Sequence, residues 1–159
     1  MKNIFTFIII CVLAPLAMLA QTEKNEADFF KATYGLNKMD AYKNFILVEL
    51  ANKDAFWEVF EQYESERLEL RDKKLVMIQE YSDNYMILDD KIIDKLVKRS
   101  LDLNDRTSKL LRKYYKKLKK VGGSKVAGQF VQIESYFRSI AKSALYESIP
   151  LIGELDTLE

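Results

Sequence analysis

Residues 110–137, LLRKYYKKLKKVGGSKVAGQFVQIESYF, contain the signals that decide the fold. Their apolar positions are Leu110, Tyr114 and Val121 before the two glycines, and Val126, Phe130, Ile133 and Phe137 after them. Steps of three, four or seven residues place such side chains on one face of a helix. Gly122-Gly123 is expected to stop the first helix, and Ser124 to cap the next. The stretch therefore predicts helix, turn and helix.

Two long helices are predicted before this turn. Asn52 is placed to cap a helix that runs to about Tyr81, and Asp89 to cap a second one that reaches Val121. The first has apolar residues at Phe56, Phe60, Tyr63, Leu70, Met77 and Tyr81, interrupted by Arg67 and Lys74. The second has Ile93, Leu96, Leu103, Leu110, Tyr114 and Val121, interrupted by Ser100 and Thr107. The short connection between the two helices predicts that they run antiparallel.

The ends of the chain complete an all-α prediction, a long antiparallel helical hairpin with a C-terminal helix that ends before Pro150. No alternating strand pattern occurs, and Gly and Pro are scarce, at 5 and 2 residues. The predicted organisation is an export signal over 1–20, an N-terminal arm over 21–50 with short helical pieces that include 39–50, a helical domain over 51–152 and a tail over 153–159.

The first 20 residues resemble a cleavable export signal. Lys2 precedes an apolar run over 4–13, Pro15 breaks it, and small residues lead to a cleavage site near Ala20. This predicts a periplasmic or secreted protein. A retained membrane anchor and a lipid anchor on Cys11 are the alternatives, and the latter is disfavoured because bulky Ile10 precedes the cysteine.

Composition excludes several kinds of chemistry. The chain has 159 residues, no histidine and one cysteine, Cys11, which leaves with the signal. The mature chain therefore has no disulfide and no thiolate or imidazole group for catalysis or zinc binding. We expect no enzymatic activity, no metal and no cofactor. Export removes one of the 25 basic residues and none of the 24 acidic ones, so the mature net charge is near zero.

A basic segment lies at the end of the second long helix. Nine basic residues and no acid occur over 106–125, whereas the start of the first long helix is acidic. The two segments are predicted neighbours, so one interpretation is mutual neutralisation. The other is a docking surface for anionic lipid or for an acidic stretch of a protein. Nucleic acid is not an expected partner, because no recognition motif accompanies the basic residues.

Adjacent aromatic residues predict a second apolar surface. Phe56 and Trp57 point about 100° apart on a helix, so one buried stripe cannot cover both. Phe56 and Phe60 are assigned to the core, whereas Trp57 and Tyr115 are candidates for partner contact. The predicted partner-binding residues are Trp57, Arg112, Tyr115, Lys116, Lys119 and Lys120.

Residues 50–152 resemble the periplasmic Spy/CpxP family, whose members carry Leu-Thr-x-x-Gln boxes at helix starts. Leu50-Ala51-Asn52-Lys53-Asp54 occupies the place of the first box, with Ala51 for Thr and Asp54 for Gln, and Phe56-Trp57 follows it. The C-terminal similarity rests on Lys120-Val121, Lys125, Ala127, Phe130, Gln132-Ile133-Glu134 and Ile149-Pro150-Leu151, with Gly122-Gly123 in place of Leu-Pro.

This resemblance implies a bent helical hairpin with an extra helix, often paired as a homodimer. It implies either an ATP-independent chaperone for unfolded or envelope protein clients, or an accessory that acts on a sensor protein in envelope stress. The physical reading agrees with a binding role, since basic groups attract clients and a limited apolar surface holds them weakly. The alternative is a structural or anionic-lipid-associated envelope component.

Overall fold

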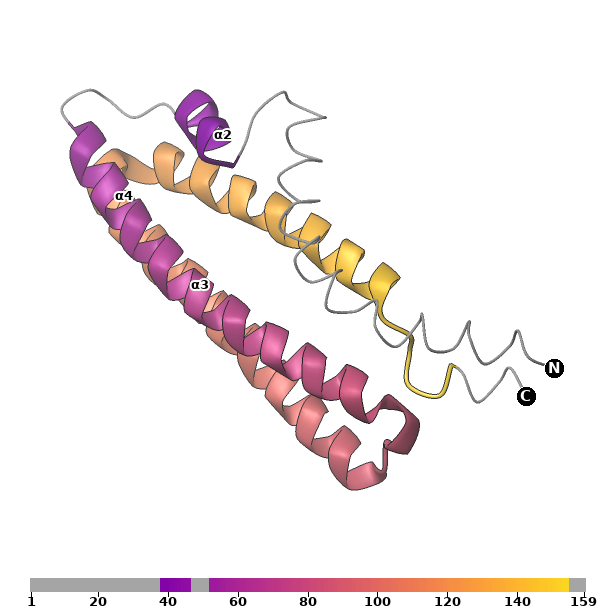
Figure 1. Cartoon of the computed structure of the whole chain (residues 1–159). Coiled ribbons are helices and arrows are strands. Elements are labelled where there is room, and N and C mark those ends of the chain that lie inside the picture. Colours follow the sequence, from indigo (N-terminus) through magenta and orange to yellow (C-terminus); the bar gives the residue numbers. More distant parts are fainter. Residues whose placement is uncertain (1–37, 47–51, 155–159) are drawn as a thin grey trace. The chain divides into compact units, whose positions relative to one another are not determined.

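The computed structural model describes residues 38–46 and 52–154, and this part of the chain is helical without any strand. Its elements are α2 (Lys38–Phe45), α3 (Lys53–Asn84), the 3-10 turn η2 (Tyr85–Ile87) and α4 (Asp90–Ser148) (Figure 1). The all-α prediction is therefore confirmed. The predicted export signal, most of the N-terminal arm and residues 155–159 of the tail lie outside the described residues.

The chain divides into two compact units. Residues 38–136 form one, and residues 137–154 are the described part of the other. In the second unit α4 ends at Ser148, two residues before Pro150, close to the predicted end. A turn follows, in which the Glu154 amide donates to the Leu151 carbonyl at 3.0 Å.

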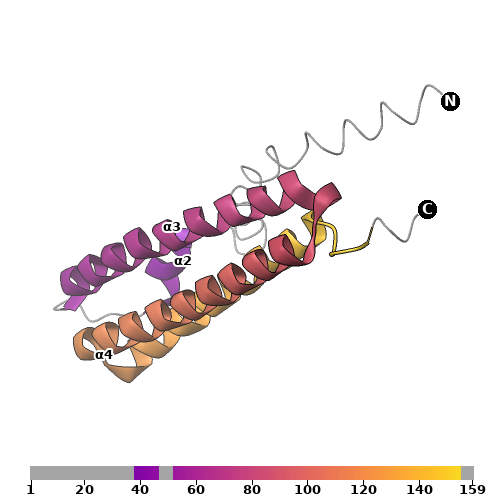
Figure 2. The same ribbon diagram turned by 90° about the horizontal axis from the view of Figure 1, so that it is seen from below.

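Side chains join α3 to α4 in antiparallel order. Near the η2 turn, Glu80 of α3 accepts hydrogen bonds from Lys95 and Arg99 at 2.5 and 2.9 Å. Farther from the turn, Glu66 pairs with Lys113 at 2.6 Å, and Gln62 accepts from Lys117 at 3.0 Å. Residues earlier in α3 therefore pair with residues later in α4, as they do between two antiparallel helices. Two perpendicular views show α3 beside this part of α4 (Figure 1 and Figure 2).

Helix α4 changes direction at Gly123. This residue has φ 77° and ψ 179°, outside the helical region. We call residues 90–122 the first arm and residues 124–136 the second arm of α4. The Tyr63 ring lies 5.3 Å from that of Tyr114 in the first arm and 4.9 Å from that of Phe130 in the second. A straight helix would separate these two positions by about 24 Å, so the chain must fold back between them.

Each of the two turn positions requires glycine for a different physical reason. Gly123 adopts a backbone conformation that is essentially restricted to glycine. A Cβ atom on Gly122 would come within 2.8 Å of the buried Val126 side chain. The turn predicted from Gly122-Gly123 therefore lies where expected, with the non-helical conformation on the second glycine.

Gly123→Ala is expected to lower the free energy of unfolding by about 1–3 kcal/mol, because alanine is strained in this conformation. Urea unfolding followed by circular dichroism measures the change. Gly128→Ala is the matched control, since Gly128 lies in the same helix with open space where a Cβ would be. It should gain roughly 0.5–1 kcal/mol from helix propensity. Equal effects of the two substitutions would contradict this role of Gly123.

Helix ends agree with the sequence in part. The Asp89 carboxylate accepts a hydrogen bond from the Ile92 amide at 2.7 Å, which confirms Asp89 as the cap of α4. The prediction for Asn52 is wrong in its mechanism, since Asn52 precedes α3 but its side chain makes no capping hydrogen bond. The short helix predicted over 39–50 ends at Phe45 in α2.

The predicted apolar faces form the core of the first unit. Its buried residues include Phe56, Phe60, Tyr63 and Met77 of α3, and Leu96, Leu103, Leu110, Tyr114, Leu118, Val126 and Phe130 of α4. Leu118 was not on the predicted stripe. Thr107 is accommodated there because its hydroxyl donates to the Leu103 carbonyl at 2.7 Å. Helix α2 packs against α3 at Phe60, whose ring lies 4.5 Å from that of Tyr42.

Candidate functional site

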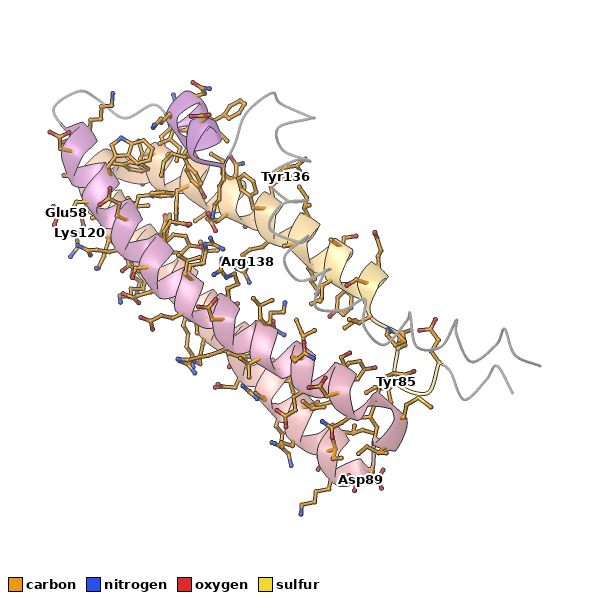
Figure 3. All side chains as sticks on the ribbon, viewed as in Figure 1. Glu58, Tyr85, Asp89, Lys120, Tyr136 and Arg138 are labelled. Atoms are coloured by element: carbon orange, nitrogen blue, oxygen red, sulfur yellow. The ribbon has the colours of Figure 1, made fainter. Side chains whose placement is uncertain are left out.

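A row of basic side chains lines the solvent face of the first arm of α4. We call it the basic outer face, and its residues are Lys109, Arg112, Lys116, Lys119 and Lys120. All five are exposed. The steps of three and four residues from Lys109 to Lys119, with Lys120 next to Lys119, place them on the side of the helix opposite Leu110, Tyr114 and Leu118. The row is about 16 Å long at 1.5 Å per residue. Lys120 lies far from the Asp89 end of the hairpin (Figure 3).

Of the other basic residues of the segment, two pair with carboxylates and one donates to an uncharged amide. Lys113 pairs with Glu66, Lys117 donates to Gln62, and Arg106 lies 3.7 Å from Asp102. Hydrogen bonds from Lys113 and Tyr114 hold the pKa of the Glu66 carboxyl below its ordinary value. In contrast, no carboxylate in the described part of the chain pairs with a residue of the basic outer face. Mutual neutralisation therefore accounts for one side of the segment and leaves the outer side charged.

Exposed apolar residues continue this face toward the η2 turn. Val97 and Leu101 are 43% and 62% exposed and lie one turn apart. Leu101 and Arg112 are eleven residues apart, about three turns, so both lie on one stripe of α4. Met86 and Ile87 of η2 are 80% and 68% exposed. The first arm thus presents apolar residues at one end and basic residues at the other.

The structure places the six predicted partner-binding residues in two groups. Arg112, Lys116, Lys119 and Lys120 belong to the basic outer face, and the partly exposed Tyr115 lies beside them on α4. Trp57 is separate. It is half-buried on α3, with its ring edge-on to Phe56 and Phe60 at 5.1 and 5.4 Å. Phe56 and Phe60 themselves are buried, as expected for core residues.

A buried carboxylate that is not among the predicted partner-binding residues joins three helices. Glu134 of the second arm of α4 is 1% exposed. Its Oε2 accepts a hydrogen bond from the Tyr63 hydroxyl at 2.6 Å, and its Oε1 accepts one from the Tyr42 hydroxyl. Lys38 Nζ lies 2.9 Å from the same Oε1. Residues of α2, α3 and α4 therefore meet at one carboxyl group.

The polar cluster extends from Glu134 toward solvent. Lys38 Nζ also donates to Glu64 at 2.9 Å, and Arg67 binds both oxygens of Glu64 at 3.0 and 2.9 Å. Burial raises the pKa of Glu64, but the Lys38 ammonium and the Arg67 guanidinium outweigh it and keep that pKa below its ordinary value. Two cations thus balance two carboxylates, and Arg67 interrupts the apolar stripe of α3 for this reason.

Burial also changes the two tyrosines that contact Glu134. Loss of water contact raises the pKa of Tyr63 and of Tyr42 well above the ordinary 10.0, and the Glu134 carboxylate adds to the effect. Both hydroxyls remain protonated donors at neutral pH. The cluster therefore connects the helices through hydrogen bonds to the Glu134 carboxylate, and the two tyrosine hydroxyls do not act as acids near neutral pH.

One sequence signal could have found Glu134. It lies four residues after Phe130 and three before Phe137, so it occupies the apolar stripe of its helix. A carboxylate at such a position needs buried donors. The sequence could not identify Tyr42 and Tyr63 as those donors, since they lie 92 and 71 residues away.

Comparisons with known proteins supply no relative. No family model, curated protein or solved structure matches this chain. Among the described residues, no helix has the length and apolar character needed to cross a membrane, and no three acidic or other metal-binding side chains come together.

Proposed function

We propose that this protein is a non-enzymatic binding protein of the cell envelope, with a Spy/CpxP-like role as a chaperone or as the accessory of a stress sensor. The observation that carries the proposal is the basic outer face of α4, where five exposed basic residues have no ion pair within the described chain. The resemblance over residues 50–152 and the export signal predicted over 1–20 support the same role.

The first arm of α4 suits weak binding of unfolded acidic segments. Its positive potential attracts an acidic chain over about 8–10 Å at physiological salt and speeds encounter. Val97 and Leu101, on the same helix face, offer limited apolar contact. Binding of this kind is fast, reversible and independent of ATP.

Replacing Lys109, Lys116, Lys119 and Lys120 by glutamate is expected to weaken binding of an acidic unfolded client about 10-fold or more, since attraction becomes repulsion. The test measures how residues 21–159 suppress aggregation of a reduced, acidic client without ATP. The matched control replaces Lys43, Lys53, Lys73 and Lys91 by glutamate; these exposed lysines lie off the basic outer face and have no ion pair in the described chain. The control has the same net charge and should act like the wild type.

The outcome distinguishes the proposal from its rivals. Absence of suppression by the wild type at several-fold excess, or equal loss in both variants, would overturn it. Sedimentation with anionic vesicles tests the lipid-associated alternative, for which each lysine near the surface contributes about 1 kcal/mol. Vesicle binding that is lost in the first variant, without client binding by the wild type, would favour an envelope component.

A further inference from the structure

Helix α2 owes its structure to the surface beneath it. It has eight residues, and helices shorter than about 12–15 residues are marginal in water. Ala41 and Tyr42 are fully buried, whereas Met39, Lys43, Asn44 and Phe45 face solvent. Ala41 and Tyr42 thus form the buried face of the helix, and the Gln129 side chain donates a hydrogen bond to the Phe45 carbonyl at 2.9 Å.

The surface that receives this face combines aromatic rings with carboxylates. We call it the α2 seat, and its residues are Phe60, Tyr63 and Glu64 of α3 and Phe130 and Glu134 of α4. The Tyr42 ring lies 4.5 Å from Phe60 and 6.2 Å from Phe130. These rings are at most 1% exposed with α2 in place, so removal of α2 would uncover an apolar surface.

Charge defines what the α2 seat accepts. Lys38 balances Glu64 and Glu134 from one turn before Tyr42, and its own side chain remains 21% exposed. Without α2, two carboxylates would face a single guanidinium, that of Arg67. The α2 seat is thus complementary to a cation followed one turn later by an aromatic residue with a hydroxyl group.

The rest of the α3–α4 pair does not depend on α2. The pairs of Gln62 with Lys117, Glu66 with Lys113, and Glu80 with Lys95 lie along the hairpin and involve no residue of α2. Detachment of α2 is therefore a local opening that leaves these contacts intact.

We infer that the α2 seat is a binding site for a short amphipathic helix of a partner protein, with a Lys or Arg and a tyrosine one turn apart, and that α2 occupies it as an internal competitor. The partner class rests on the proposed function, because a client-binding protein needs a second, apolar contact beside its basic outer face. Binding of a helix in a groove is an established mode of peptide recognition.

Weakening α2 tests the inference directly. The full chain with Lys38→Ala and Tyr42→Ala should bind a labelled peptide of residues 37–46 about 10-fold more tightly than the wild type, because the internal competitor no longer occupies the α2 seat. Fluorescence anisotropy measures the affinity. The matched control, Lys43→Ala with Asn44→Ala, changes the exposed side of the same helix and should bind like the wild type. Equal binding to all three chains, or no binding to any, would overturn the inference.

A second measurement leaves the residues of the α2 seat unchanged. Ala41 of α2 and Ala127 of the second arm are both fully buried, so Ala41→Cys and Ala127→Cys are matched reporters in a Cys11→Ser chain. The thiol at position 41 should react with a thiol reagent at least about 10-fold faster, and excess peptide should accelerate it further. Equal rates, or no acceleration, would also overturn the inference. Neither measurement uses the basic outer face or a client, so its failure is distinct from failure of the aggregation assay.

Discussion

Replacing Glu134 by alanine is expected to lower the free energy of unfolding by about 3–5 kcal/mol, as for removal of one partner from a buried ion pair. The hydroxyls of Tyr42 and Tyr63 would lose their acceptor in a space that excludes water. Lys38 would lose its ion pair with Glu134 and keep the one with Glu64. Because these donors come from α2 and α3, the substitution should destabilise α2 and α3 as well as α4. Chemical denaturation followed by circular dichroism measures the effect.

Two further variants show whether unmet hydrogen bonds cause the loss. Glu58→Ala removes an exposed carboxylate from α3 and should change the unfolding free energy by no more than about 0.5 kcal/mol. Combining Glu134→Leu with Tyr42→Phe and Tyr63→Phe removes donors and acceptor together, so it should recover most of the stability. A triple variant as unstable as Glu134→Ala would contradict the explanation.

Raising the pH above about 10 is expected to destabilise residues 38–136 progressively. Tyr42 and Tyr63 have folded-state pKa values well above the ordinary 10.0, first through burial and then through Glu134. Unfolded tyrosines release their protons at the ordinary pKa, so the unfolded chain gains stability first. The contribution of each tyrosine is complete below pH 10 and falls by about 1.4 kcal/mol per pH unit above it.

Stability measured at several alkaline pH values checks this expectation. Tyr63→Phe removes one of the three described tyrosines with a raised pKa, which are Tyr42, Tyr63 and Tyr114, so its stability should fall less steeply with pH, by about 1.4 kcal/mol per pH unit. Tyr146→Phe is the control, because Tyr146 is 57% exposed and lies outside residues 38–136. Identical slopes in wild type and Tyr63→Phe would show that Tyr63 is not the group responsible.

The sequence predicted the residues of the basic outer face, but it did not predict which basic residues of the segment pair with α3. The run over 106–125 identified the residues, and their spacing placed Arg112 and Lys116 on one side of a helix. Which lysines find a partner on α3 depends on the register between α3 and α4, which brings Glu66 to Lys113 and Gln62 to Lys117. Register arises from side-chain packing between helices, and helical periodicity does not encode it.

Local signals determined the two long helices of this protein and some of their limits. Asp89 begins α4 through a hydrogen bond three residues away, and Gly123 breaks the helix through its own backbone freedom. Only the tertiary structure decided that Glu134 is buried with Tyr42 and Tyr63, and that α2 covers the aromatic rings between α3 and α4. The physical reason is the distance along the sequence over which each interaction acts. Caps and turns involve residues a few positions apart, whereas a buried charge needs hydrogen-bond donors that only folding brings together from distant parts of the chain.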